Sequence, residues 1–391
     1  MSGAYQRLKQ AIAGEPLPLA LVDLDALDRN FDRLLASARG KKLRIASKSV
    51  RCPALLRYLA DRAGPAVIGL MTYTAAETEF LASEGWKDLL LAYPTVQPSD
   101  LQALVRANQH STAAVAVDSA EQTDALSVAA AAAGVSVPVV IDVDMSYRPI
   151  EALHLGVRRS PLRSAAAVVA LARRILTSPS LRLHGLQAYE AQIAGMTDDN
   201  PFKRLLKLLS RPQVERRRSA LARALAAEGL ALPLFNGGGS GSVSWAAGEA
   251  ALTELTVGSG FLASHLFDHY RDLRLEPAAY FALQVTRAPT AGIVTCLGGG
   301  LVASGEAGPD RLPLPALPPG LKLLPLEGAG EVQTPLRVPA GTRLGLGDPV
   351  FFRHAKAGEL AEHFNEYLLV RGERVESRVP TYRGLGRCFL G

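Results

Sequence analysis

The chain has 391 residues, of which 48% are hydrophobic and 20% are charged. This is the balance of a globular protein of one or two domains, and it excludes a disordered or low-complexity chain. No apolar run reaches the roughly 18 residues of a membrane-spanning helix, and the first residues show no secretory signal pattern. Cys52, Cys296 and Cys388 are too widely spaced for a disulfide framework or a metal knuckle. We therefore expect a cytoplasmic protein.

The chain carries a formal net charge of +6, with 43 Lys and Arg residues against 37 Asp and Glu. A basic chain can indicate nucleic-acid binding. Here, however, the arginines are scattered along helical stretches, and only 6% of the residues are aromatic. We expect no nucleic-acid partner and no membrane partner, and a mild attraction for small anions instead.

From the N-terminus, short aliphatic runs alternate with Ala- and Leu-rich stretches of helical periodicity. Nine strands are predicted, at residues 17–22, 43–47, 66–70, 88–92, 113–117, 137–143, 181–188, 232–235 and 255–257. Regular alternation of strand and helix favours a parallel sheet, and eight such units favour a closed (β/α)8 barrel of the TIM type. One strand must then lie outside the barrel, and the first strand is the natural candidate.

After about residue 275 the helical periodicity fades, and short strands separated by Gly and Pro indicate an antiparallel β domain. Its predicted strands are residues 280–287, 292–296, 342–346, 348–352 and 367–371. The proline-rich segment 309–325 is predicted to be a long surface loop. We expect a barrel over residues 25–272, with residues 1–24 and 273–391 forming the β domain.

A lysine follows the first predicted barrel strand: Lys48 stands in the segment RIASKSV. Reactive residues of such barrels lie at the carboxyl ends of the strands. Partly apolar surroundings lower the pKa of a lysine and free its amine as a nucleophile. The alternative is a lysine that merely extends its ammonium to solvent at a strand end.

Glycine-rich segments follow the last two barrel strands, as NGGGSGS (236–242) and GSG (258–260). Glycines allow backbone N–H groups to curve around an oxyanion, and barrels commonly bind phosphate at these two loops. Neither segment matches a P-loop or a dinucleotide fingerprint. Together with Lys48, they indicate a phosphorylated carbonyl cofactor, namely pyridoxal 5′-phosphate.

At this point the sequence resembles the fold-type III pyridoxal-phosphate enzymes, in particular the branch of D-threonine aldolases and D-serine dehydratases, and more distantly the alanine racemases. The resemblance extends over nearly the whole chain. Its matching segments are LVDLDALDRN (21–30), ASKSVRCPALLR (46–57), AAETEFLASEGWKDLLLAYP (75–94), GLQAYEA (185–191), NGGGSGS, ELTVGSGFL (254–262) and LGDPVFFRHAKAGE (346–359).

The resemblance implies that the strand at 17–22 joins the β domain and that the protein is a homodimer. It implies that Lys48 is the Schiff-base lysine and a base at Cα, and that Tyr189 lies beside the cofactor. Arg148 is expected to face the pyridine ring or the substrate carboxylate. A tyrosine at the edge of the core and a solvated loop arginine are the alternatives. The implied phosphate contacts are Gly238, Gly239, Ser240, Gly258 and Ser259.

The sequence departs from this family at one expected metal site. The aldolases and dehydratases bind a divalent cation through a histidine and, two residues later, an aspartate or cysteine. Here His354 occupies the first position and Lys356 the second, and an ammonium is not a ligand for a hard cation. One hypothesis is that Lys356 replaces the charge of the metal; the alternative is an exposed strand end without a role. Glu359 and His363 lie close in sequence and offer another ligand set or an ion-pair network.

The cofactor weakens whichever bond at Cα lies perpendicular to its ring. The resemblance therefore favours a D-threonine aldolase-type cleavage of a β-hydroxy-α-amino acid into glycine and an aldehyde. Elimination by a D-amino acid dehydratase or deaminase comes second, and racemisation third. A non-catalytic pyridoxal-phosphate carrier is the alternative that is not an enzyme, and the long C-terminal β domain argues against it.

Overall fold

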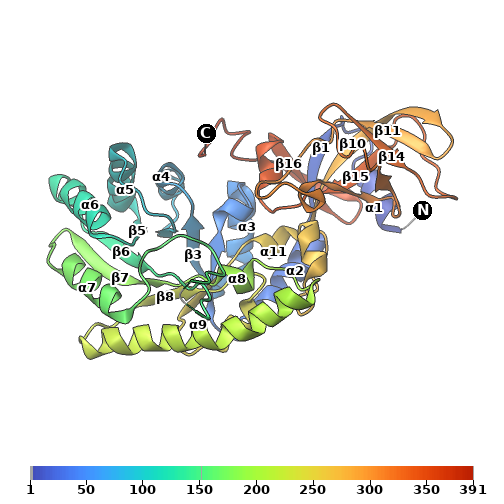
Figure 1. Ribbon diagram of the computed structural model, residues 1–391. Coiled ribbons are helices and arrows are strands. Elements are labelled where there is room, and N and C mark those ends of the chain that lie inside the picture. The colour runs from blue at the N-terminus through green and yellow to red at the C-terminus, as the bar shows by residue number, and fades with distance from the viewer. Residues whose placement is uncertain (1–2, 151, 391) are drawn as a thin grey trace. The chain divides into compact units, whose positions relative to one another are not determined.

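The computed structural model of the chain describes residues 3–150 and 152–390 (Figure 1). These residues form two compact units. The barrel unit consists mainly of Leu34–Lys48 and Ala60–Gly258. The sheet unit combines the N-terminal stretch up to Arg33 with Ser49–Leu59 and Ser259–Cys388. Helices α2 (Leu24–Ser37) and α3 (Pro53–Ala63) contribute residues to both units.

The predicted (β/α)8 barrel is confirmed, because eight parallel strands close into a ring in which the last strand pairs with the first. All nine strands predicted for this part of the chain are present, and the first of them lies in the other unit. The barrel strands are β2 (Lys42–Ala46), β3 (Val67–Thr72), β4 (Asp88–Leu91), β5 (Thr112–Val117), β6 (Val137–Asp142), β7 (Leu181–Gln187), β8 (Leu234–Gly237) and β9 (Glu254–Val257).

Helices follow the barrel strands, and the sequence marks where several of them begin. Thr74, Ser119 and Ser164 each accept a hydrogen bond from a backbone N–H in the first turn of the helix that follows, which offsets the unpaired donors of that turn. The barrel unit contains α4 (Ala75–Ser83), α5 (Pro98–His110), α6 (Ala120–Ala132), α7 (Ala165–Leu176), the short α8 (Ala191–Ala194), α9 (Pro201–Ala227) and the short α10 (Val243–Ala246).

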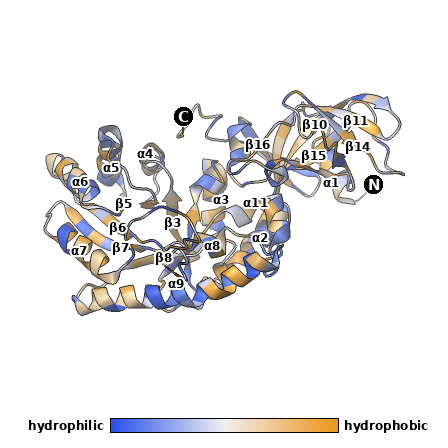
Figure 2. Ribbon diagram, in the orientation of Figure 1, coloured by the Kyte–Doolittle hydropathy of each residue, from blue (hydrophilic) through white to orange (hydrophobic). Residues whose placement is uncertain are grey.

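Helix α7 is amphipathic. In α7 the buried residues Val168, Leu171, Ala172 and Ile175 recur every three to four positions and so form one face. The long helix α9 shows hydrophilic and hydrophobic stretches in alternation (Figure 2), and its buried positions include one arginine, Arg218.

The sheet unit contains a nine-stranded sheet with the order β13-β14-β11-β10-β1-β16-β17, in which β15 pairs with β10 and β12. All pairings are antiparallel except that between β1 and β16. The strands are β1 (Leu19–Asp23), β10 (Ala279–Thr290), β11 (Ile293–Leu297), β12 (Leu314–Leu317), β13 (Lys322–Leu323), β14 (Gln333–Arg337), β15 (Pro349–Arg353), β16 (Glu366–Arg371) and β17 (Arg374–Pro380).

The core of this sheet lies under the N-terminal helix α1 (Gly3–Ala11). Tyr5 and Leu8 of α1 are buried against Leu21, Phe351 and their neighbours on the central strands, and the Tyr5 hydroxyl donates to the Pro349 carbonyl at 3.1 Å. The unit is completed by the short helix α11 (Ser259–Leu262) and by four 3₁₀ turns, at Ser47–Ser49 on its border and at His265–His269, Pro309–Arg311 and Glu359–Glu362.

Two predictions for the sheet unit are wrong. Residues 342–346 form no strand; they run into a turn in which the Gly345 N–H donates to the Asp348 carboxylate at 2.8 Å. The segment 309–325 is not a continuous loop, because it contains β12 and β13. Both strands pair on one side only, and an edge position is where a sheet tolerates proline.

A buried arginine links three strands inside the barrel. Arg44 of β2 is 1% exposed, and its guanidinium donates to Glu254 of β9 at 2.7 and 2.9 Å and to Asp88 of β4 at 2.7 Å. Asn236 of β8 also donates to Glu254, at 2.6 Å. A guanidinium and a carboxylate can be held in such a dry site because each satisfies the other.

Replacing Arg44 with Ala should destabilise the barrel by about 3 to 5 kcal/mol, because it leaves Glu254 buried without its counter-charge. Urea unfolding followed by circular dichroism measures the change. The control is Lys42→Ala on the same strand, where the lysine is exposed and the expected change is within about 0.5 kcal/mol. Equal urea midpoints for the two variants would contradict the prediction.

Candidate active site at the barrel mouth

Lys48 lies at the carboxyl-terminal rim of the barrel, as predicted from its position after a strand. It is in the single 3₁₀ turn that follows β2, and its side chain is exposed. The Lys48 ammonium donates to the hydroxyl of Tyr93 at 2.9 Å and lies 5.6 Å from the centre of that ring. Tyr93 follows β4, so two strand ends hold the amine in place.

Tyr189 follows β7 at the same rim, and Arg159 connects it to Tyr93. The Arg159 guanidinium lies 5.7 Å from the centre of the Tyr189 ring and 5.9 Å from that of Tyr93, within the range of cation–π attraction. Burial raises the pKa of the Tyr189 phenol, which therefore stays protonated at neutral pH. The contacts at the rim form a chain from Lys48 through Tyr93 and Arg159 to Tyr189.

Sequence analysis did not find Tyr93 or Arg159. Tyr93 had a usable signal, because it directly follows a predicted strand, as Lys48 does. Arg159 had none, because it belongs to an irregular loop after β6. Arg148, which was predicted, lies in a different cluster: it pairs with Asp144 at 3.1 Å, beside Arg163 at 2.9 Å from the same carboxylate.

A buried carboxylate also lies at the rim. Asp142 ends β6, and the Gln187 amide donates to it at 3.1 Å and to the Ala92 carbonyl at 3.1 Å. Burial raises the pKa of Asp142 to about 6, and the negative charge of Asp118 acts in the same direction. Asp142 can therefore gain or lose a proton near neutral pH.

The glycines after β8 are needed for close packing as well as for a turn. A Cβ added to Gly237 would lie 2.7 Å from Nη2 of Arg218, and one added to Gly239 would lie 2.9 Å from the Ala194 Cβ. Gly238 has a φ of +78°, a conformation that favours glycine. Three consecutive positions therefore exclude a side chain, each for its own physical reason.

The predicted phosphate-binding loops are connected to each other by hydrogen bonds. The Gly258 N–H donates to the hydroxyl of Ser240 at 3.2 Å. The Gly239 N–H donates to Ser242 at 3.0 Å, and the Gly238 N–H donates to Glu190 at 3.1 Å. A direct contact of these groups with a phosphate stays a prediction. Ser259 begins α11 and belongs to the sheet unit.

A buried ion cluster lies directly against the glycine run. Arg218 of α9 is completely buried and pairs with Glu190, which follows Tyr189, and with Glu249. One guanidinium thus faces two carboxylates. Burial raises the pKa of Glu249 to about 7, with Glu190 adding to the shift and Arg218 opposing it. One oxygen of Glu249 has no hydrogen-bond partner among the described residues.

The predicted metal position lies in the sheet unit, just after β15. His354 is 3% exposed, and neither ring nitrogen has a hydrogen-bond partner among the described residues. Burial, Arg353 and His265 lower its pKa to about 3, so the imidazole is neutral at physiological pH. The Lys356 ammonium donates to the Ser304 hydroxyl at 3.4 Å, and the Ser304 N–H donates to Glu359 at 2.9 Å.

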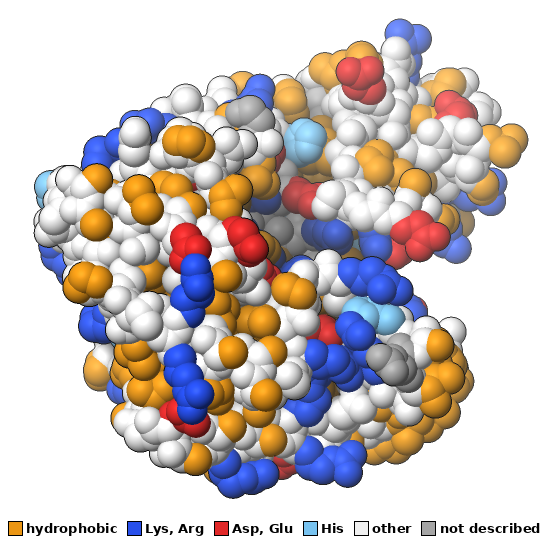
Figure 3. All heavy atoms as spheres, turned by 60° about the vertical axis from the view of Figure 1, so that its left-hand side comes forward, with side chains coloured by type: hydrophobic (Ala, Val, Ile, Leu, Met, Phe, Trp, Pro, Cys, Tyr) orange, Lys and Arg blue, Asp and Glu red, His pale blue; other side chains and the backbone are white. Residues whose placement is uncertain are grey.

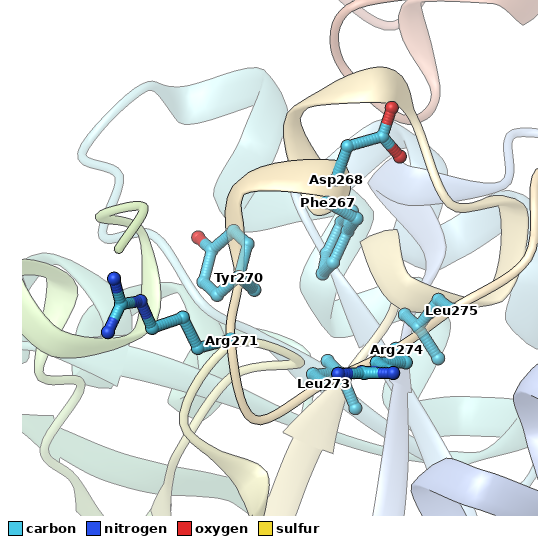
Figure 4. Close-up of a pocket in the computed structure, with 7 residues that line it drawn as sticks. All are labelled: Phe267, Asp268, Tyr270, Arg271, Leu273, Arg274 and Leu275. Carbon is cyan, nitrogen blue, oxygen red and sulfur yellow. The ribbon is translucent and has the colours of Figure 1, made fainter. Parts of the chain in front are cut away.

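A separate surface hollow of about 470 Å³ lies in the sheet unit and is lined by residues of the segment 267–275 (Figure 4). The carboxylate of Asp268 is already bound by Arg353, at 2.6 and 2.9 Å. The side chains of Asp268 and Arg271 extend in different directions (Figure 4), so the charged groups do not converge on a common point. The hollow shows no constellation for chemistry.

The surface view shows Lys and Arg side chains spread among hydrophobic and uncharged ones on the face in view (Figure 3). Among the residues that the structure describes, no helix has both the length and the apolar character needed to cross a lipid bilayer.

Comparison with known proteins shows the family. A family model described as "Alanine racemase, N-terminal domain" matches residues 22–263, which is more than half of the chain. The chain belongs to the alanine racemase N-terminal domain family. The resemblance inferred from the sequence is thereby confirmed.

Two characterised relatives of this racemase-family chain are aldolases. A 3-hydroxy-D-aspartate aldolase of Paracoccus denitrificans (strain Pd 1222) is 28% identical over 245 residues, which are 62% of this chain and 59% of that protein. A D-threonine aldolase of an Arthrobacter species is 27% identical over 254 residues, 63% of this chain and 62% of that protein. The match thus spans about three fifths of each relative.

The fold is shared over a longer stretch. The crystal structure of a D-threonine aldolase from Filomicrobium marinum superimposes with a TM-score of 0.81 and 22% identity, covering 94% of this chain and 95% of that one. This likeness shows that both units of the racemase-family chain have counterparts in one solved fold.

The family implies pyridoxal 5′-phosphate, and the residues at the barrel mouth fit this group. Lys48 offers an accessible amine, and Arg159 offers a cation at the same rim. The glycine run presents bare backbone, because a Cβ on Gly239 would also lie 3.3 Å from the Tyr189 ring. The barrel therefore offers an amine for the aldehyde of the cofactor, a cation for an anionic group, and open backbone beside Tyr189 for a flat ring.

The divalent cation implied by the resemblance does not fit. Among the described residues, no group of three or more His, Cys, Asp or Glu side chains is arranged to hold a metal ion. His354 has the chemistry of a ligand, but Lys356 has no lone pair to offer. Burial and the neighbouring positive charge of Arg353 also lower the pKa of His354.

The pKa of Glu249 predicts a pH dependence of stability. Because the folded protein holds this proton more tightly than the unfolded chain, the stabilisation is present at pH 5 and is lost as the pH rises through about 7. Glu249→Gln mimics the protonated form, so the variant should match the native protein at pH 5 and melt at a higher temperature at pH 8.

Thermal unfolding at four pH values between 5 and 8 measures this difference. Glu327→Gln, at an exposed glutamate, makes the same change where no burial is involved and should leave the curve unchanged. Melting curves of Glu249→Gln that run parallel to those of the native protein would contradict the assignment.

Proposed function

We propose that the chain is a pyridoxal-phosphate enzyme that cleaves a β-hydroxy-D-amino acid into glycine and an aldehyde. The observation that carries this proposal is Lys48, an accessible amine held by Tyr93 at the mouth of a closed eight-stranded barrel. The names of the two characterised relatives support the aldolase reaction over the other reactions of the fold.

When bound, pyridoxal phosphate supplies an electron sink for the bond that breaks at Cα. In the proposed site, Lys48 would hold the cofactor through its aldehyde group, and the Lys48 amine would accept or donate a proton at Cα. Tyr93 orients that amine through the 2.9 Å hydrogen bond. The phosphate is held by Gly238, Gly239, Ser240, Gly258 and Ser259.

Arg159 takes the role that was predicted for Arg148. Its guanidinium lies between two aromatic rings at the same rim as Lys48, whereas Arg148 is bound by Asp144. A cation at this point attracts the cofactor ring nitrogen or the substrate carboxylate and fixes which Cα bond stands perpendicular to the ring. Tyr189 keeps its proton and serves as a hydrogen-bond donor beside the ring.

His354 and Lys356 are proposed to act on the β-hydroxyl of the substrate. A neutral imidazole, for whose nitrogens the described residues provide no hydrogen-bond partner, can accept a hydrogen bond from the hydroxyl group. The ammonium of Lys356 supplies the positive charge for which the resemblance implies a divalent metal. We also expect the homodimer and the cytoplasmic location that follow from the sequence.

The experiment is an assay of glycine release from D-threonine by the purified, cofactor-loaded protein, with a chelator and with added manganese. We expect equal rates under both conditions and a loss of at least a thousandfold in Lys48→Ala. Borohydride reduction followed by intact-mass spectrometry should attach the cofactor to the native protein and not to this variant.

Other products would redirect the proposal. Release of a 2-oxo acid and ammonia would indicate elimination, and an inverted amino acid would indicate racemisation. Covalent cofactor without any turnover of amino acids would overturn the enzyme proposal in favour of a carrier. Glycine release that stops in chelator would contradict the role of Lys356.

Lys356→Asp should convert the site into a metal site, because it places a carboxylate two residues from the unpartnered His354 imidazole. We expect the variant to bind about one Mn²⁺ per chain in equilibrium dialysis and to need manganese for glycine release. The control is Lys322→Asp, an identical change at an exposed lysine, which should bind no additional metal. A Lys356→Asp variant that is fully active in chelator would refute the charge-replacement hypothesis.

A further inference from the structure

We propose that Glu190 is a positioning residue that sets the shape of the phosphate-binding loops from beneath, with Arg218 as its counter-charge. The inference rests on the proposed function only in that the ligand of these loops carries a phosphate group. It assigns a role to the buried ion cluster of Glu190, Arg218 and Glu249.

Both oxygens of the Glu190 carboxylate bind the glycine run. One accepts the Ser242 hydroxyl at 2.6 Å, and the other accepts the Gly238 N–H at 3.1 Å. Ser242 in turn accepts the Gly239 N–H at 3.0 Å. A single carboxylate therefore fixes the orientation of two consecutive peptide groups and both sides of the turn at residues 238–242.

The fixed turn also determines the second loop. Ser240 lies at the tip between Gly239 and Ser242, and its hydroxyl accepts the Gly258 N–H at 3.2 Å. The orientation that Glu190 imposes is thus passed from the loop after β8 to the loop after β9. The two loops that were predicted independently to bind phosphate behave as one hydrogen-bonded assembly.

A carboxylate beneath an anion-binding loop would repel a phosphate unless its charge were balanced. Arg218 provides that balance. Both Glu190 and Arg218 are 0% exposed, and Arg218 also donates to the Ala188 carbonyl at 2.6 and 3.2 Å. The approach of the guanidinium to the loop is so close that only glycine fits at position 237.

The position of Glu190 in the chain adds a second consequence. It directly follows Tyr189 and precedes the four-residue helix α8. The hydrogen bonds that hold the carboxylate therefore also fix the backbone that presents the Tyr189 ring, from which a Cβ on Gly239 would be only 3.3 Å away. The Glu190 side chain therefore fixes the position of the glycine loop relative to the Tyr189 ring.

A purely structural ion pair and a positioning carboxylate predict different binding behaviour. If Glu190 only stabilises the fold, its loss weakens the binding of pyridoxal phosphate and of pyridoxal, which lacks the phosphate, to the same extent. If Glu190 shapes the loops, its loss weakens the binding of pyridoxal phosphate and leaves the binding of pyridoxal unchanged. The ratio of the two dissociation constants therefore separates the roles and requires no catalytic activity.

The test is an absorbance titration of the full-length protein, stripped of cofactor, with pyridoxal phosphate and with pyridoxal. Ser242→Ala is the main variant, because it removes one link between Glu190 and the loop and keeps the ion pair of Glu190 with Arg218. Glu190→Gln is the second variant. We expect pyridoxal phosphate to bind each about tenfold more weakly, which corresponds to one lost hydrogen bond, and pyridoxal to bind within twofold of the native value.

Two matched controls complete the design. Ser244→Ala makes the same change two residues further on, in α10. Glu249→Gln removes the other carboxylate that pairs with Arg218. Both controls should keep the native ratio of the dissociation constants for pyridoxal and pyridoxal phosphate.

Two results would overturn the inference. One is a native ratio of these constants in Ser242→Ala and Glu190→Gln. The other is a native protein that does not bind pyridoxal phosphate more tightly than pyridoxal. Absence of glycine release alongside normal phosphate-dependent binding would count against the proposed reaction and leave this inference standing.

Discussion

Hydrogen bonds between β2 and β9 join the first and last strands of the barrel, with Lys42 opposite Glu254 and Ile45 opposite Val257. Because all eight strands are parallel, closing this ring brings every carboxyl end to one rim. Residues that are far apart in the sequence, such as Lys48, Tyr189 and Gly258, thus come to the same rim. Without the closing pair, the lysine and the last glycine loop would lie at opposite edges of an open sheet.

Two buried arginines serve the barrel in different ways. Arg44 connects β2, β4 and β9 from inside, whereas Arg218 enters from α9 and meets the loop that follows β8. Each faces two carboxylates, and an ion pair in a dry site adds little net stability compared with apolar packing. Such a pair does fix the orientation of its partners, because a guanidinium donates its hydrogen bonds only in a planar, forked geometry. In the case of Arg218, this fixed geometry orients the groups of the loop after β8.

The barrel could be predicted because a strand that is buried on both faces has a continuous run of apolar residues. Such a run can be recognised within the sequence of the strand itself. The same rule failed in the sheet unit, where β14 contains Pro335 and pairs with β11 through it, and where β12 and β13 lie at edges. Lys48 and the glycine run could be predicted, since each stands directly after a strand. Tyr93 offered the same signal, but Arg159 and the pair of Glu190 and Arg218 depend on contacts between distant segments, and no local pattern marks them.

The difference between a lysine and a metal ion at position 356 is one of geometry as much as of charge. A divalent cation must be held by several ligands, so its position is dictated by all of them together. An ammonium is attached to its own chain and needs only acceptors, here the Ser304 hydroxyl next to Glu359. Its position therefore depends on a flexible side chain and on acceptors such as the Ser304 hydroxyl. In the proposed site the ammonium polarises the substrate oxygen less strongly than a bound metal ion would, and His354 lies two residues away as a buried, neutral acceptor.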